Sequence, residues 1–216
     1  MKSIRRIKTN IRDLLERNDL KTIIELARNN PRIVSVLISM SYDKDSLLTW
    51  RAIEAIGPVV AEISKNSPEQ GADIVRRLLW SITEESGGIG WAAIEMLAEI
   101  IVNYPERYKN LVPLLMEFYD EEIFRDGVLY AIGRIGERMP ELFDDPDKIE
   151  DIISDGLTSD DPQIRGLALI ACKRLADTLH GIGQEQIRRL KGDESTFTVY
   201  EKGRLINRKI NEVLHN

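Results

Sequence analysis

The chain has 216 residues, of which 43% are hydrophobic and 31% are charged, and its formal net charge is −6. This composition is that of a folded globular protein and excludes a disordered chain. No apolar run reaches the roughly 20 residues that a membrane-spanning helix needs, and the acidic balance disfavours nucleic acid as a partner, because that binding depends on clustered Lys and Arg.

The first segment, residues 3–29, has the pattern of one or two amphipathic helices. One face carries Ile4, Ile7, Ile11, Leu14 and Leu15. We expect these helices to cap a stack of repeats, because a terminal repeat otherwise exposes its apolar side. The segment has no apolar run of signal-peptide length, and the single cysteine excludes an intramolecular disulfide. We therefore expect a cytoplasmic protein.

A nine-residue pattern occurs four times along the chain. The copies align without gaps as TWRAIEAIG (49–57), GWAAIEMLA (90–98), RDGVLYAIG (125–133) and RGLALIACK (165–173). Their first residues lie 41, 35 and 40 positions apart, which indicates a two-helix unit of the HEAT type. A second apolar helical segment precedes each copy, so each unit is predicted to consist of helix A, a short turn and helix B.

Helix starts are marked by a capping side chain followed by proline. Proline suits the first helical position, because the N–H that it lacks has no partner there. The four occurrences are Asn30-Pro31, Ser67-Pro68, Asp145-Pro146 and Asp161-Pro162. They support an assignment of nearly all of the chain to helices.

The sequence predicts an all-α fold, a right-handed α-α superhelix of the HEAT/armadillo type that forms a single domain over residues 1–216. The predicted parts are the capping helices (1–29), four repeats (30–190) and a C-terminal appendage (191–216). In the appendage, TFTVY (196–200) and RLIN (204–207) flank a turn and predict a small hairpin. A last short helix is expected at about 208–214.

Two motifs resemble those of known HEAT-like repeats. The run Asp161-Pro162-Gln163-Ile164-Arg165 resembles the D-P-x-V-R opening of a HEAT helix B, and YAIGRIG (130–136) resembles the A-L-G-x-I-G ending found in phycobilin lyases. ESGGIGW (85–91) is similar to a stretch in small uncharacterised HEAT-like proteins of anaerobic prokaryotes. The resemblance covers about residues 30–180. It implies the repeat fold but no particular activity, since such repeats serve many tasks.

The first two repeats carry tryptophan next to the position where the other two carry Arg125 and Arg165. Trp50 and Trp91 are 41 residues apart, as are Glu54 and Glu95. Stacking would place these side chains in one strip, with Arg51 beside it. Trp is frequent among interface hot spots, so one interpretation is a partner-binding strip with groove-lining glutamates. The other is that both indoles fill the space between helices A and B.

The turn before the second helix B is rich in glycine. Gly87, Gly88 and Gly90 permit close backbone approach or positive φ. A dinucleotide fingerprint is disfavoured, because that motif needs a preceding strand, whereas the segment before this turn is predicted to be helical. The turn is either a tight entry to the helix or a place where backbone N–H groups receive a partner's carboxylate.

Residue types suited to catalysis or metal binding are scarce. His180 and His215 are the only histidines, so a His-rich metal site is excluded. Cys172 replaces an apolar residue of the repeat pattern, and we expect a buried packing residue. His180 is expected to end a helix, where a cation suits the dipole. No metal and no cofactor are predicted.

Charge is unevenly distributed. The first twelve residues include Lys2, Arg5, Arg6, Lys8 and Arg12 without an acid, whereas residues 141–161 carry nine carboxylates and one lysine. These segments are either a basic edge for an acidic partner and an acidic edge for a basic one, or solvated faces and helix caps.

We expect a non-catalytic scaffold or adaptor that holds another protein in its groove, with Trp50, Arg51, Glu54, Gly87, Gly88, Gly90, Trp91 and Glu95 as the candidate partner-binding residues. The alternative is an enzyme or cofactor chaperone that resembles the phycobilin lyases and holds a planar small molecule against the two indoles. The sequence leaves the partner's identity and the oligomeric state open.

Overall fold

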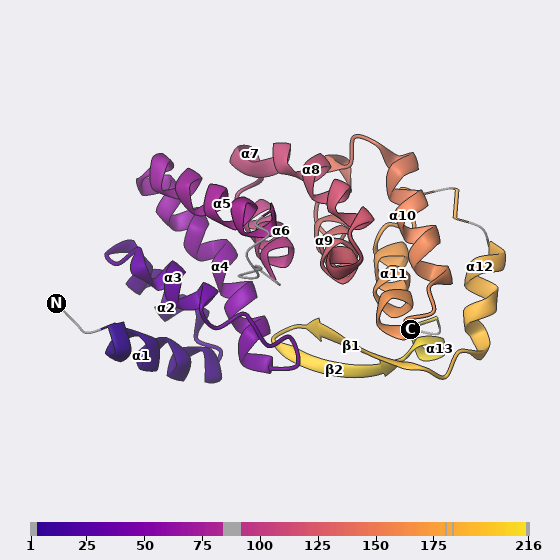
Figure 1. The fold of residues 1–216 in the computed structure, drawn as a ribbon, viewed down its shortest axis with the longest axis horizontal. Coiled ribbons are helices and arrows are strands. Elements are labelled where there is room, and N and C mark those ends of the chain that lie inside the picture. The colour runs from indigo at the N-terminus through magenta and orange to yellow at the C-terminus, as the bar shows by residue number, and fades with distance from the viewer. Residues whose placement is uncertain (1–3, 84–91, 180, 183, 215–216) are drawn as a thin grey trace. The chain divides into compact units, whose positions relative to one another are not determined.

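The computed structural model describes residues 4–83, 92–179, 181–182 and 184–214, and most of them are helical (Figure 1). Two compact units divide the chain, Met1–Tyr108 and Lys109–Asn216. The prediction of a helical fold with a small C-terminal hairpin is confirmed. None of the described helices combines the length and apolarity that crossing a bilayer requires. A single superhelical stack over the whole chain stays a prediction.

The first unit consists of helices that match the predicted segments. The described part of the first predicted segment forms two helices, and the first two copies of the repeat pattern lie on α4 and, for the part that is described, on the start of α6. The helices are α1 (Ile4–Glu16), α2 (Leu20–Arg28), α3 (Arg32–Ile38), α4 (Leu47–Asn66), α5 (Pro68–Thr83), α6 (Ala93–Asn103) and α7 (Pro105–Tyr108). Helix α4 packs against α2, α3, α5 and α6 and is the centre of this unit.

Helices α4 and α6 come into close backbone contact at Gly57. A Cβ atom at this position would lie 2.5 Å from the carbonyl oxygen of Glu99 and 2.5 Å from Nδ2 of Asn103. The amide of Asn103 donates to the same carbonyl at 2.8 Å. Glycine is therefore required here by the spacing of the two helices, and the flanking Ile53 and Ile56 are fully buried.

Helix α1 packs on the first unit through the end of its apolar face. Ile11, Leu14 and Leu15 are buried. Asn18 adopts φ 56° after the helix end, a conformation that asparagine tolerates at helix C-termini. Ile4, predicted to belong to the same buried face, has an exposed fraction of 65%, because the packing of α1 begins only beyond its first turn.

The second unit contains the last two copies of the repeat pattern, on α9 and α11. Its helices and strands are α8 (Val112–Glu117), α9 (Arg125–Gly136), α10 (Pro146–Thr158), α11 (Pro162–Arg174), α12 (Gln184–Arg189), β1 (Thr196–Glu201), β2 (Arg204–Lys209) and α13 (Ile210–Val213). Short 3-10 turns connect them: η1 (Lys109–Leu111), η2 (Phe118–Asp120), η3 (Glu122–Phe124), η4 (Pro140–Leu142) and η5 (Leu190–Gly192). Within this unit, α11 packs against α9 and α10.

Two of the predicted helix caps have the expected geometry. The Asp145 carboxylate accepts from the N–H of Lys148 at 3.1 Å, and the Asp161 carboxylate accepts from the N–H of Gln163 at 2.8 Å. Asn30 does not cap a helix, because α3 begins at Arg32 and Pro31 takes the cap position. Cys172 is buried, as predicted, and this burial raises the pKa of its thiol.

The predicted C-terminal hairpin forms and packs on α11. Its strands are antiparallel, with Thr198 opposite Asn207, and the turn residues Lys202 and Gly203 have φ of 49° and 77°, as a two-residue I′ turn requires. The Phe197 ring lies directly over Gly166, where a Cβ would overlap it. The backbone of Thr198 exchanges two hydrogen bonds with the side-chain amide of Gln163, at 2.8 and 2.9 Å.

An ion pair between Arg165 and Asp193 joins the hairpin region to α11. The Arg165 Nε donates to Oδ2 of Asp193 at 2.9 Å, and the N–H of Ser195 donates to Oδ1 at 2.9 Å. Burial works to raise the pKa of Asp193, but the hydrogen bonds from Ser195 and Arg165 outweigh it and hold the pKa below its ordinary value. The charged form of Asp193 is thus the form that the fold stabilises.

The stability that Asp193 contributes should therefore depend on pH. Because its pKa is lowered on folding, this contribution is present above the ordinary value of 3.8 and is lost as the pH falls through the lower folded value. At neutral pH, Asp193→Asn should lower the free energy of unfolding by about 1–3 kcal/mol, and the difference from wild type should shrink in acid. Denaturant unfolding at both pH values measures it. A difference that grows in acid would contradict the ion pair.

Candidate functional site

The predicted partner-binding residues divide into two groups. Gly87, Gly88, Gly90 and Trp91 lie outside the described residues. Trp50, Arg51, Glu54 and Glu95 are described and belong to the first unit, the first three on α4 and the last on α6. Only this second group can be placed.

Trp50 is part of the core of the first unit. Its exposed fraction is 8%, and its indole N–H donates to the carbonyl of Lys44 at 2.7 Å. The neighbouring Thr49 hydroxyl, also buried, donates to the carbonyl of Met40 at 2.9 Å. Together these two hydrogen bonds hold the turn between α3 and α4 against the start of α4. For Trp50, the structure thus agrees with the core interpretation of the tryptophan pattern.

Glu95 lies inside the unit, whereas the sequence pattern predicts a position that lines a groove. Its exposed fraction is 1%, and its Oε1 lies 2.6 Å from Nζ of Lys44, which comes from the turn that Trp50 fastens. The reason for the difference is that α6 is buried on all sides from Ala93 to Val102, so no face of this helix remains for a surface strip. Burying a carboxylate demands a partner, and Lys44 supplies the positive charge.

Arg51 and Glu54 complete the described part of the predicted strip. The Arg51 guanidinium donates from Nη1 to the carbonyls of Leu15 and Glu16, at 3.0 and 2.8 Å, and thereby caps the end of α1. Glu54 is half-buried on α4. The contacts of Trp50, Arg51 and Glu95 therefore join α1, the α3–α4 turn, α4 and α6, as those of a structural framework do.

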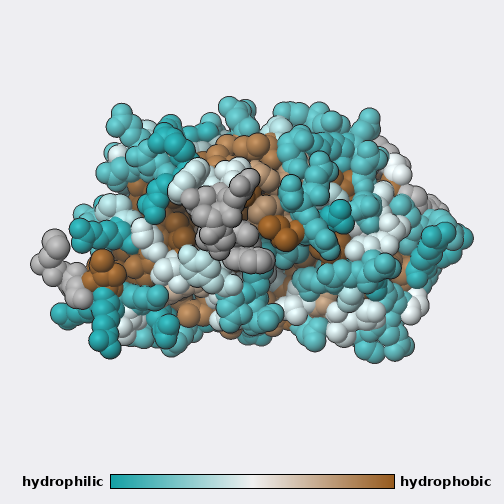
Figure 2. Space-filling view, in the orientation of Figure 1, coloured by the Kyte–Doolittle hydropathy of each residue, from teal (hydrophilic) through white to brown (hydrophobic). Residues whose placement is uncertain are grey.

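Several large apolar side chains are exposed at other positions. Among the described residues they are Ile4, Leu26, Tyr42, Trp80, Leu114 and Ile123. Trp80 has an exposed fraction of 62%, although its segment has the pattern of an apolar helix A. The exposure of Trp80 could have been read from the sequence. Trp80 lies one helical turn after Arg76 and Arg77 and therefore shares their solvent-facing side of the helix. Most of the remaining surface on the face shown in Figure 2 is hydrophilic.

A cavity of about 210 Å³ in the second unit is lined by α8, the segment before α10, and α10 itself. We call it the acidic pocket. Its floor consists of four buried apolar side chains, Val112, Met116, Phe143 and Ile149. Its rim consists of Pro113, Glu117, Asp144, Asp145 and Lys148. An apolar interior with a few polar groups at its edge is the ordinary composition of a binding pocket.

Tyr119, one turn beyond Met116, links η2 to α10 next to the acidic pocket. Its hydroxyl donates to the Asp155 carboxylate on α10 at 2.8 Å. Burial, with the hydrogen bond to Asp155 as a further cause, raises the pKa of the Tyr119 phenol well above its ordinary value. The guanidinium of Arg125 lies 5.4 Å from the centre of the Tyr119 ring. These contacts fix η2, which directly follows α8, against α9 and α10.

The rim of the acidic pocket is negatively charged. Lys148 pairs with Glu117 at 2.5 Å, whereas Asp144 is exposed and stands in a segment, 141–161, with nine carboxylates and one lysine. Such a site can accept an apolar side chain and attract positive charges around it. The sequence predicts an acidic edge here, but the cavity depends on how α8 meets α10, for which no sequence motif exists.

The rim carboxylates also bear on metal binding. In the part of the chain that the structure describes, no group of three or more His, Cys, Asp or Glu side chains is arranged to hold a metal ion. The acidic residues of the pocket are spread along its edge, where they give the opening a negative potential.

Comparison with known proteins gives one relative of similar length. An uncharacterised protein from Archaeoglobus fulgidus is 27% identical over 186 residues, which cover 83% of this chain and 92% of the relative. No family model and no solved structure matches the chain. The chain is thus similar to an archaeal protein over most of its length, and this similarity adds no activity to the arrangement of residues described above.

Proposed function

We propose that this protein is a non-catalytic scaffold that binds a segment of another protein chain, and that the acidic pocket is the binding site. The observation that carries the proposal is the pocket itself, an apolar floor of buried side chains beneath an exposed carboxylate rim. Its volume of about 210 Å³ suits an apolar side chain rather than a large cofactor.

The scaffold role also accords with a HEAT-like repeat architecture, which we retain as part of the proposal. In each unit, the two helices that carry copies of the repeat pattern pack against one another, α4 with α6 and α9 with α11. Repeats that stack in this way present extended surfaces on which other proteins bind.

The planar-ligand alternative depends on two indoles beside a groove. Trp50, the one that is described, is buried and directs its N–H to the Lys44 carbonyl. No observation therefore favours that function over the scaffold.

Affinity purification of the tagged full-length protein from its own cells, with mass spectrometry, tests the proposal. Asp144→Lys on the rim, combined with Asp147→Lys at the exposed first turn of α10 beside it, replaces two negative charges at this edge by two positive ones, and we expect this variant to lose the protein that wild type enriches. A loss of tenfold or more in recovered partner is expected, because charged rims contribute strongly to attraction between partners.

The matched control is Glu25→Lys combined with Glu69→Lys. Both residues are exposed in the first unit, and the change in net charge is the same. The control should retain the partner. Equal recovery from wild type and from both variants would rule out the acidic pocket as the binding site, and equal loss from both variants would indicate an effect of net charge alone.

A further inference from the structure

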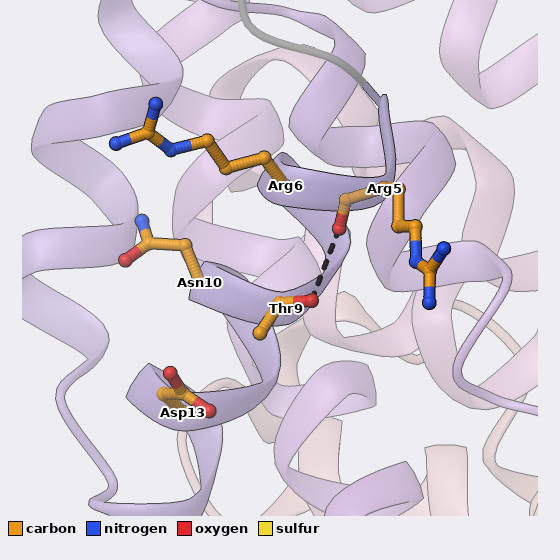
Figure 3. Close-up of a pocket in the computed structure, with 5 residues that line it drawn as sticks. All are labelled: Arg5, Arg6, Thr9, Asn10 and Asp13. Carbon is orange, nitrogen blue, oxygen red and sulfur yellow. Dashed lines mark hydrogen bonds between the residues drawn. The ribbon is translucent and has the colours of Figure 1, made fainter.

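The first half of α1 carries positive charge, whereas the rim of the acidic pocket carries negative charge. Arg5, Lys8 and Arg12 follow one another at helical spacing on one face and line a shallow hollow together with Thr9. A second hollow, on the neighbouring face, is lined by Arg5, Arg6, Thr9, Asn10 and Asp13 (Figure 3). In Figure 3 the side chains of Arg5 and Arg6 extend in different directions from the first turn, so positive charge covers a wide part of the helix. We call residues 4–12 the basic helix end.

An exposed apolar side chain stands at the tip of the basic helix end. Ile4 has an exposed fraction of 65%, whereas Ile11, two turns later on the same side, is fully buried. Figure 2 shows an apolar patch at this end of α1. The apolar stripe of α1 thus continues beyond the part of the helix that is packed. Burial of the exposed Ile4 side chain in another apolar site would be favourable.

The basic helix end and the acidic pocket are complementary in both charge and polarity. One presents an aliphatic side chain flanked by arginine and lysine, and the other presents an apolar cavity of about 210 Å³ rimmed by Glu117, Asp144 and Asp145. Opposite potentials across an interface steer association and fix its register. Every molecule carries both elements, so a partner with the required chemistry is always present at the protein's own concentration.

We propose that the acidic pocket of one molecule binds the basic helix end of a second copy, with Ile4 in the apolar cavity and Arg5 and Lys8 beside the carboxylate rim. This inference rests on the proposed function and names its partner. The contact is heterologous, because two different surfaces meet. Head-to-tail association of this kind extends into a chain or closes into a ring.

Sedimentation velocity of the full-length protein tests the contact. Wild type should associate as its concentration rises. The association should weaken as the salt concentration increases from about 0.05 M to about 0.5 M, since the Debye length falls several-fold over this range. Ile4→Asp should weaken it about tenfold or more, because the apolar contact is lost. A wild-type protein that stays monomeric at every concentration would overturn the proposal.

A mixing experiment distinguishes head-to-tail contact from any other mode. The first variant, Arg5→Gln with Lys8→Gln, keeps an intact acidic pocket, and the second, Asp144→Lys with Asp147→Lys, keeps an intact basic helix end. Glutamine in the first variant leaves no charge that the lysines of the second variant could attract. Each should be monomeric alone, and an equimolar mixture should form a dimer that grows no further. All four residues are exposed, and circular dichroism checks that both variants are folded. A mixture that stays monomeric, or variants that each associate like wild type, would overturn the proposal.

The two proposals fail in different ways. If wild type is monomeric but still enriches a different protein that only the acidic-pocket variant loses, the self-association is wrong and the scaffold function stands. If the acidic-pocket variant changes neither sedimentation nor recovery of a partner, both are wrong.

Discussion

Replacing Gly57 by alanine should destabilise the first unit by about 2–3 kcal/mol, the upper part of the range for overpacking a tight core. The added methyl group would lie 2.5 Å from the Glu99 carbonyl oxygen and 2.8 Å from the carbonyl carbon. Backbone atoms of a packed helix cannot move aside as the end of a side chain can, so α4 and α6 must separate. Thermal unfolding followed by circular dichroism measures the loss, which should lower the Tm by roughly 5–15 °C.

Gly133→Ala is the matched control. This glycine occupies the position in the third copy of the pattern that Gly57 occupies in the first, and it also lies inside a helix, α9. There the nearest atoms to an added Cβ are 3.4 to 3.7 Å away, on Arg174 and Ala171. Alanine should be neutral or stabilise by up to about 1 kcal/mol, since it favours helix more than glycine does. Equal losses at both positions would contradict the close contact of α4 with α6.

Replacing Lys44 by methionine should destabilise the first unit by about 2–4 kcal/mol. The change keeps the length of the side chain but removes the positive charge 2.6 Å from Glu95, and a buried carboxylate without its counter-charge costs several kcal/mol. We place the value below the full range for buried pairs because 23% of the Lys44 side chain is exposed. Urea unfolding at neutral pH measures the effect.

The double variant Lys44→Met with Glu95→Gln controls for the loss of the lysine itself. It removes both charges at nearly constant volume, so much of the lost stability should return. If the double variant were as unstable as the sum of the two single variants, Lys44 and Glu95 would not interact, and the buried ion pair would be disproved.

The helices and the hairpin are predictable from the sequence, because these elements depend on local signals. The spacing of the four copies locates α4, α9 and α11, and Asp145 and Asp161 cap helices where a capping residue precedes proline. The hairpin follows from alternation around a turn with glycine. Each of these features is determined by residues within a few positions of one another.

The site is less predictable, because exposure depends on residues distant in the sequence. The equal spacing of Glu54 and Glu95 suggests equal surroundings, but Glu54 is half-buried whereas Glu95 is buried on a helix enclosed on all sides. The pattern alone leaves Trp50 as either a surface anchor or a core residue, and its contact with the Lys44 carbonyl decides for the core. The acidic edge is visible in the sequence, but the cavity within it is lined by residues of α8, of the segment before α10 and of α10 itself, which lie far apart along the chain.

Photo-crosslinking from the acidic pocket tests the central claim most directly. Pro113 lines the pocket and is exposed, and it can be replaced by benzoylphenylalanine in the full-length protein in its own cells. The same residue at Tyr42, which is 61% exposed in the first unit, serves as control. We predict a discrete crosslinked protein from Pro113 that is absent from Tyr42 and is lost with Asp144→Lys and Asp147→Lys. Labelling from Pro113 no stronger than from Tyr42, or unchanged by these substitutions, would contradict protein binding at this pocket.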